Sequence, residues 1–259
     1  MALLLTSCIA ALAYICFVMG IAFLCCTRQH LALLRVSGGL SREISLGFLA
    51  SGVFVFSPAG ILPPIVPTSI GLGVIMGIFL LTLLMLRFEP VVGTIAMTAI
   101  SAGLAPLCVG ICLCAWIAYT SGFPGKPFDP AVFVTLPLWS VLEGWGRAGL
   151  AATASALLLF LSHAFPCLPG SPLAWNVLRL GVVQLVLFLL LPMTVWPTFL
   201  PNVPEHAVIL CFIGNWIFVI VLARLLCIIS RYMQKYTMLA WSLLLCGAGL
   251  CVIETLMAT

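Results

Sequence analysis

Long apolar runs, separated by short polar stretches, make up almost the whole chain. A membrane-spanning helix needs about 20 largely apolar residues. Runs suited to that length lie at residues 3–27, 46–66, 68–87, 91–119, 133–163, 175–199, 207–228 and 237–257. The pattern therefore predicts an all-α integral membrane protein, a bundle of about eight transmembrane helices that forms a single transmembrane domain over residues 1–259.

Two of these runs are irregular. The run over 46–66 is interrupted by Pro58, Pro63 and Pro64, and the run over 133–163 is long and contains Glu143 and Arg147. Proline and glycine are tolerated in membrane helices where neighbouring groups satisfy the backbone. The second run is therefore weak as a span, and the fifth is a candidate for a broken helix.

Composition supports the membrane assignment. The chain is 64% hydrophobic and only 6% charged, whereas soluble domains average about 45–50% apolar and about 25% charged residues. Short loops leave no room for a soluble catalytic domain. The formal net charge of +4 comes from cations placed singly at span ends, which does not indicate nucleic-acid binding.

No basic stretch precedes the first run and no cleavage site is clear, so we expect a retained first span rather than a signal peptide.

The basic residues predict the orientation, because Lys and Arg concentrate in cytoplasmic loops. With eight spans and both termini outside, Lys126 lies in an outer loop and Arg147 within a span, while Arg179 and Arg224 lie near inner ends. The inner loops then hold the other basic residues, namely Arg28, Arg35, Arg42, Arg87, Arg231 and Lys235. The chain is therefore expected to be a multi-pass protein of the cytoplasmic (inner) membrane.

Motifs for catalysis or cofactors are missing from the sequence. Most of the 12 cysteines lie inside apolar runs, where cysteine behaves as a small hydrophobic residue. Cys112 and Cys114 have no further ligand at zinc spacing, and no P-loop, HExxH or Ser/His/Asp array occurs. Three histidines do not suit paired haem ligation. We therefore expect no catalytic residue and no cofactor bound by this chain.

The strongest intramembrane candidates are Glu143 and Arg147, because an ionisable residue at membrane depth is a functional-site hypothesis. Four residues apart, they share a helix face and suit a polar path through the bundle. In the alternative interpretation, "EGWGR" marks a break near the membrane interface and both side chains reach water. His163 and Arg179 are weaker candidates for such a path. The other acids, Glu43, Glu89, Asp129, Glu205 and Glu254, are interpreted as solvated span ends.

Four stretches together resemble the membrane subunit that anchors the hydrophilic arm in complex I and in its relatives, formate hydrogenlyase and the energy-converting hydrogenases. They are "LRLGVVQLVLFLLLPMTVWP" (Leu178–Pro197), "AVILCFIGNWIFVIVLARLLCIISRYMQKYTMLAW" with Arg224, Arg231 and Trp241, "FEPVVGTIAMTAISAGLAPLCVGICL" (Phe88–Leu113), and "RVSGGLSREISLGFLA". That family has eight spans in this orientation. The resemblance implies a non-catalytic subunit of an oxidoreductase complex, with other membrane and hydrophilic subunits and lipid as partners.

The chain also departs from that family. Where the family carries an Arg-Glu pair in segment four, this chain has Ala102 and Gly103, and its loop "HAFPCLPGSPLAWN" has no acid. The resemblance therefore favours an anchoring role over ion conduction by this subunit. It implies a docking surface on the inner face, formed by Arg28, His30, Arg35, Arg42, Glu43, Arg87, Arg231 and Lys235.

Two other functions stay open. Broken segments suit a small transporter or permease, with "SPAGILPPIVPTSIGLG" (Ser57–Gly73) and "EGWGR" lining a midplane site. A non-conducting scaffold subunit is the other alternative, and the small-residue stretch "AGLAATASA" (Ala148–Ala156) suits the close helix packing that either role needs.

Overall fold

The computed structural model describes the chain over ten segments. They are residues 2–24, 40–58, 64–66, 68–89, 92–121, 126–135, 138–166, 171–190, 205–233 and 236–258. The regular secondary structure in these segments is helical throughout. The prediction of an all-α chain is confirmed.

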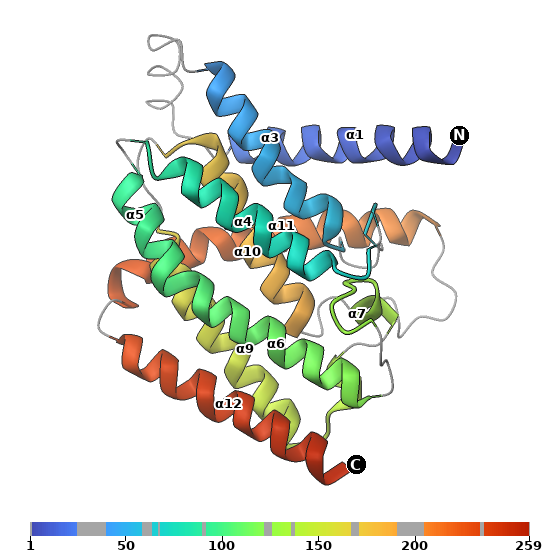
Figure 1. Cartoon of the computed structure of the whole chain (residues 1–259), viewed down its shortest axis with the longest axis vertical. Helices are drawn as coiled ribbons and strands as arrows, with labels where there is room; N and C mark the ends of the chain where they lie inside the picture. Colours follow the sequence, from blue (N-terminus) through green and yellow to red (C-terminus); the bar gives the residue numbers. More distant parts are fainter. Residues whose placement is uncertain are drawn as a thin grey trace.

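Each of the eight predicted intervals overlaps a long helix or a continuous helical stretch (Figure 1). These are α1 (Ala2–Leu24), α3 (Leu40–Phe56), α4 (Gly71–Leu86), α5 (Gly93–Thr98) continued by η1 (Ala99–Gly103) and α6 (Leu104–Thr120), α9 (Gly144–Ala164), α10 (Leu173–Leu190), α11 (Glu205–Met233) and α12 (Thr237–Ala258). Two short helices, α7 (Val132–Thr135) and α8 (Leu138–Val141), precede α9.

Five of the described helical stretches are long and apolar enough to cross a membrane. They are Thr6–Leu24, Gly93–Thr120, Gly144–Ala164, Ala207–Ile229 and Thr237–Met257. The remaining three helices are shorter, with 17 residues in α3, 16 in α4 and 18 in α10. The structure thus supports an α-helical membrane protein by length and composition.

Two predicted boundaries change. The helix expected over 46–66 is α3, which begins at Leu40 and ends at Phe56. Ser57 precedes Pro58, and the residue before a proline is disfavoured in the α conformation, so the helix ends there. The run over 133–163 is broken, as its charged residues suggested, and α9 begins only at Gly144.

A π-helical turn, η1, interrupts the stretch from α5 to α6. Its last two residues, Ala102 and Gly103, are small. A Cβ built on Gly103 would lie 2.7 Å from the Ala164 Cβ. The turn therefore brings the backbone of this stretch against the end of α9.

Contacts between helix ends define two opposite ends of the bundle. At one end, which we call the Arg42 end, Arg42 pairs with Glu89, and Glu43 accepts a hydrogen bond from Leu173 N. At the opposite end, which we call the Glu254 end, Trp116 Nε1 donates to Thr255 Oγ1 at 3.1 Å and Leu72 N donates to Phe128 O at 3.0 Å. From α3 to α10, successive long helices therefore run in alternating directions between these two ends.

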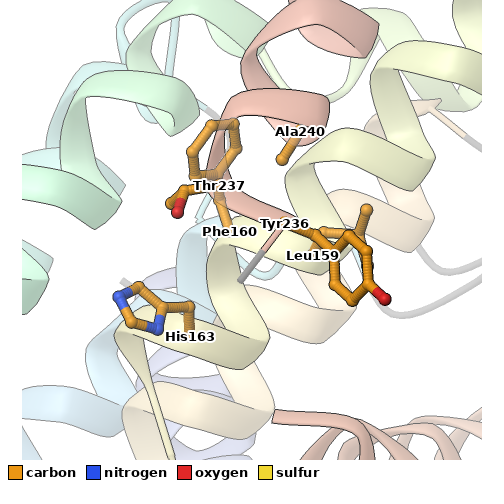
Figure 2. Close-up of a pocket in the computed structure, with 6 residues that line it drawn as sticks. All are labelled: Leu159, Phe160, His163, Tyr236, Thr237 and Ala240. Carbon is orange, nitrogen blue, oxygen red and sulfur yellow. The ribbon is translucent and has the colours of Figure 1, made fainter. Parts of the chain in front are cut away.

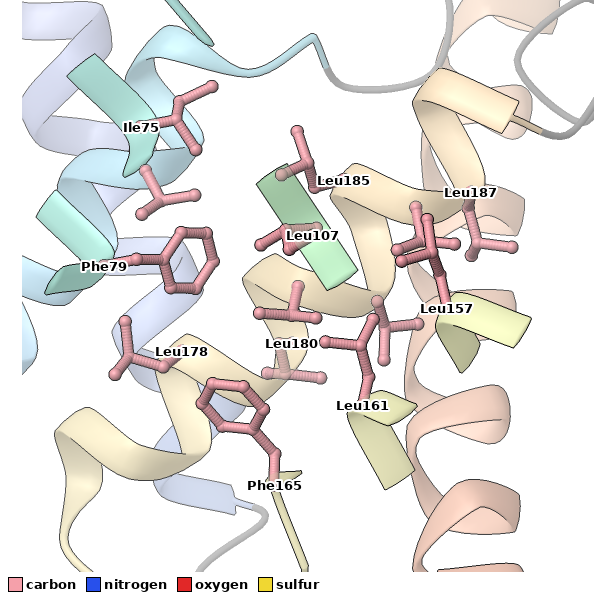
Figure 3. Close-up of a cluster of buried hydrophobic side chains, with 14 of the residues drawn as sticks. Ile75, Phe79, Leu107, Leu157, Leu161, Phe165, Leu178, Leu180, Leu185 and Leu187 are labelled. Carbon is pink, nitrogen blue, oxygen red and sulfur yellow. The ribbon is translucent and has the colours of Figure 1, made fainter. Parts of the chain in front are cut away.

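The helix α10 lies at the centre of the bundle. Every side chain from residue 171 to 187 is buried. Figure 3 shows its leucines, such as Leu178 and Leu185, packed among Phe79 of α4, Leu107 of α6 and Leu157 of α9. By contrast α1, which crosses the direction of α3 and α4 in Figure 1, exposes 59% of Ile9. The polar residues of α10 are therefore enclosed by protein.

The helices α9 and α12 lie side by side with their backbones in close contact (Figure 1). A Cβ built on Gly247 would lie 2.6 Å from Gly149 O and 2.7 Å from Thr153 Oγ1. Small residues at facing positions allow this approach, which is how membrane helices commonly associate. Part of the small-residue stretch predicted to serve helix packing, Ala148–Ala156, does so here.

We expect Gly247→Ala to force α9 and α12 apart and to lower the free energy of unfolding by about 1–3 kcal/mol, the usual cost of overpacking. Gly249→Ala on the same helix is the matched control, because a Cβ there meets nothing within 4 Å. Thermal unfolding of both purified variants in mild detergent measures the difference. Equal stability of the two variants would contradict the close contact.

Candidate functional site

The four residues proposed for a polar path lie at opposite ends of the bundle. Glu143 and Arg147 lie at the start of α9, whereas His163 lies in its last turn. About 20 residues of α-helix, or roughly 30 Å along the axis, separate Glu143 from His163. Arg179 is in the first half of α10, at the Arg42 end. The structure therefore does not bring the four together.

Glu143 is the N-cap residue of α9 and has extended backbone angles, φ −122° and ψ 169°. Gly144 follows with φ +40°, a left-handed conformation that glycine adopts without a steric cost. The Glu143 side chain is exposed and makes no capping hydrogen bond. Its carboxylate is consequently available to solvent or to a ligand at this corner.

The cap of α9 comes from another helix. Both carboxylate oxygens of Glu254, near the end of α12, accept hydrogen bonds, one from Glu143 N and one from Gly146 N. A negative charge at a helix N-terminus is stabilised by the unpaired N–H groups and by the helix dipole. The interpretation of Glu254 as a merely solvated end is therefore wrong. Its position near the end of the apolar run 237–257 was the only sequence signal, and it did not identify the partner.

Gly146 makes this cap possible. A Cβ at Gly146 would lie 2.8 Å from the Glu254 Cδ. One turn earlier on α12, the Cys251 thiol donates to Gly146 O at 3.3 Å. Gly146 of "EGWGR" therefore serves the junction with α12.

Arg147 is held by backbone carbonyls. Its Nε donates to Leu142 O at 2.6 Å and to Trp139 O at 3.1 Å, and its guanidinium lies 6.0 Å from the centre of the Trp139 ring. These contacts cap the short helix α8. Both Glu143 and Arg147 are exposed, which agrees with the interpretation of "EGWGR" as a break at the edge of the bundle.

An open pocket of about 690 Å³ lies at this corner. Its walls come from the end of α6, the α8–α9 junction and the end of α12. The lining residues are Thr120, Ser121, Val141, Leu142, Glu143, Gly144, Trp145, Glu254, Thr255 and Met257. Its volume is within the range of small-molecule sites, about 300–1,000 Å³.

A second pocket adjoins His163 at the Arg42 end, and with a volume of about 10 Å³ it holds one water at most. It lies between the end of α9 and the start of α12, lined by Leu159, Phe160, His163, Tyr236, Thr237 and Ala240. In Figure 2 the Tyr236 hydroxyl points away from the His163 imidazole. These two side chains therefore do not form a hydrogen-bonded pair across the pocket.

Arg179 is only 5% exposed and is the charged residue on the central helix. Other polar side chains on α10 are also enclosed: Asn176 Oδ1 accepts from the Ser171 hydroxyl at 3.3 Å, and Gln184 Nε2 donates to Pro58 O at 2.9 Å.

Glu43 of α3 accepts a hydrogen bond from Leu173 N at 2.8 Å and so caps the start of α10. Glu43 therefore has a structural contact within the bundle in addition to its proposed place on the docking face.

The structure describes only part of the proposed docking surface. Arg42 pairs with Glu89 at 3.2 Å while 56% of its side chain stays exposed, and Arg87 is exposed at the end of α4. Arg231 belongs to α11, and its side chain is outside the described part. Arg28, His30, Arg35 and Lys235 also lie outside the described residues. The described members thus gather at one end of the bundle.

A buried polar and aromatic cluster, which the sequence did not reveal, joins α1, α3 and α11. The Tyr14 ring lies 6.3 Å from Phe54 and 6.2 Å from Trp216, measured between ring centres. Tyr14 Oη, Trp216 Nε1 and Gln184 Oε1 are buried atoms of this region. The cluster ties the outer helices α1 and α11 to the centre.

Cysteines form no metal site within the described segments, where no three His, Cys, Asp or Glu side chains come together. Eight cysteines of the described segments are free thiols, and two of them, Cys114 and Cys251, are buried. Cys227 is disulfide-bonded, which the sequence analysis did not predict. The expectation that the chain itself binds no cofactor stays a prediction.

Comparisons with known proteins give no relative. No family model, no curated protein and no solved structure matches this chain. The roles assigned to its residues therefore rest on the chemistry and geometry described above.

We expect Glu254→Ala to lower the free energy of unfolding by about 1–2 kcal/mol, because two N–H groups at the start of α9 lose their acceptors. Glu143→Gln should leave stability in detergent unchanged, since the Glu143 side chain makes no capping bond. Chemical unfolding of the two variants and the wild type measures this. A Glu254→Ala protein as stable as the wild type would show that the cap contributes nothing.

Proposed function

We propose that this chain is the membrane-anchoring subunit of an energy-converting redox complex of the complex I or [NiFe]-hydrogenase type. It would be a multi-pass protein of the cytoplasmic membrane that holds the hydrophilic electron-transfer arm against the inner face. The proposal rests on the resemblance of the segments around Leu178–Pro197 and Trp241 to that subunit. No catalytic residue and no cofactor are proposed for this chain itself.

One observation carries the anchoring role: carboxylates of the described part hold the bundle together at its ends. Glu254 caps α9, Glu43 caps α10, and Glu89 pairs with Arg42. Each of these carboxylates is engaged in contacts that join two helices. This use of the acids supports a rigid anchor more than a proton path.

The arrangement of helices supports eight spans with both termini outside. Helix ends that would lie on the same side of a membrane contact one another, and the helices from α3 to α10 alternate in direction. The shorter helices α3, α4 and α10 pack against other helices of the bundle, so protein rather than lipid surrounds much of their length. Such helices can cross with the help of snorkelling and local thinning.

The docking surface proposed for the hydrophilic arm is the Arg42 end. Arg42 and Arg87 lie there as exposed cations, and the inner loops are expected to add Arg28, Arg35, Arg231 and Lys235. Exposed arginines suit acidic patches on a partner because their guanidinium groups bind carboxylates with two hydrogen bonds. Glu43 belongs to this end mainly as the cap of α10.

A transporter remains the second candidate, and the open pocket beside Glu143 is the observation that favours it. In that case solute flux would occur in liposomes that carry only this chain, and Glu143→Gln would abolish it. A non-conducting scaffold subunit would give neither flux nor redox partners.

The topology can be tested with single cysteines placed at Lys126 and at Arg87 in a cysteine-free chain. We expect a membrane-impermeant thiol reagent to label residue 126 in intact cells and residue 87 only after the membrane is opened, because the two positions lie on opposite sides. Labelling of both positions from outside would contradict the alternating eight-span arrangement.

The anchoring role predicts that the tagged chain, solubilised in mild detergent, is recovered with iron–sulfur or nickel–iron subunits and with antiporter-like membrane subunits. Mass spectrometry of the purified complex identifies them. Arg87→Glu should reduce recovery of the hydrophilic subunits by about tenfold, because it places like charges at the contact. Lys126→Glu, at the other end, should leave recovery unchanged. Isolation of the chain alone, stable and monodisperse, would overturn the proposal.

A further inference from the structure

The pocket beside Glu143 lies where three candidate spans end. The stretches Gly93–Thr120 and Thr237–Met257 finish there, and Gly144–Ala164 begins there. Because the ends of spanning helices mark the edge of the hydrocarbon layer, the pocket is at the depth of lipid headgroups.

The charges of the pocket suit a cation. The Glu143 carboxylate is exposed and makes no capping bond, and no Lys or Arg is among the lining residues. Glu254 is balanced by the N–H groups of α9. The C-terminal ends of α6 and α12 add partial negative charge. A positive group in the pocket would therefore be stabilised by Glu143.

The hydroxyl groups of the pocket make it an acceptor site. Thr120 Oγ1 donates to Ile117 O at 3.0 Å, and Ser121 Oγ donates to the same carbonyl at 2.6 Å. A hydroxyl whose proton points to its own helix still has lone pairs that accept. The pocket thus presents a carboxylate and hydroxyl oxygens, which favours a primary ammonium with N–H donors over a quaternary one.

A cation of the protein lies one helical turn from Glu143. Arg147 N donates to Glu143 O at 3.3 Å, and the Arg147 guanidinium is held at this corner through Nε by Trp139 O and Leu142 O. Those two bonds use neither terminal nitrogen, and the side chain is exposed. Guanidinium groups are well suited to phosphate. Beside them, Trp145 is 75% exposed, and indole favours both the interface and contact with cations.

We propose that this corner binds a zwitterionic phospholipid headgroup that carries a primary ammonium. The ammonium lies against Glu143 and the Thr120 and Ser121 hydroxyls, and the phosphate lies against Arg147. The inference does not depend on the redox partners proposed above, because it uses only the geometry of the Glu254 end.

The test is a lipid titration of the purified, delipidated full chain, followed by native mass spectrometry. Phosphatidylethanolamine is compared with phosphatidylcholine and phosphatidylglycerol of identical acyl chains, and soluble phosphoethanolamine is added as a competitor. Glu143→Gln and Arg147→Gln remove one charge each, whereas Glu143→Asp retains the acid. Lys126→Gln removes a cation from the same end that does not line the pocket.

We expect phosphatidylethanolamine to bind about five- to tenfold more tightly than the other two lipids, the gain given by one charge-assisted contact. Glu143→Gln and Arg147→Gln should reduce this preference to less than about twofold, while Glu143→Asp and Lys126→Gln retain it. Unfolding in lipid-free detergent confirms that the variants are folded. Equal binding of phosphatidylglycerol, or a preference that survives Glu143→Gln, would overturn the proposal. If soluble phosphoethanolamine displaces the lipid at equal concentration, the ligand of this corner is a free zwitterion, and the lipid proposal is overturned.

Discussion

Helix ends are the main constraint on this fold, because lipid cannot satisfy the N–H and C=O groups that each end leaves unpaired. The chain meets that constraint with carboxylates that belong to other helices. Glu254 of α12 serves the start of α9, and Glu43 of α3 serves the start of α10. Each acid therefore caps one helix and joins two at the same time, which also determines which ends lie together.

The enclosed position of α10 follows from the same constraint. Its side chains from 171 to 187 are buried although they include Asn176, Arg179 and Gln184. Buried polar groups are costly unless they are hydrogen-bonded, and here Asn176 and Gln184 bond to Ser171 and Pro58. A lipid-facing helix could not supply these partners. The polar residues of α10 thus require the surrounding helices, and the apolar α1 and α11 are left to the outside.

The sequence predicted the helices better than the contacts between them. Apolar run length located each long helix, and the charges in 133–163 indicated the break before Gly144. The start of α3 at Leu40 was missed because "SRE" reads as loop, whereas in the structure Glu43 has a partner in α10. Glu254 was misread for the same reason: hydropathy describes how a residue meets lipid or water, and it carries no information on a partner 111 residues away.

The two ends of the bundle differ in chemistry, and this difference bears on function more than the interior does. At the Arg42 end, exposed arginines stand beside acids already engaged in a cap or an ion pair. At the Glu254 end, Glu143 keeps an unengaged carboxylate one turn from Arg147. A rigid interior with caps at both ends gives little freedom for alternating access. The exposed charges at the two ends therefore support the two proposals made above, a protein partner at the Arg42 end and a lipid headgroup at the Glu254 end.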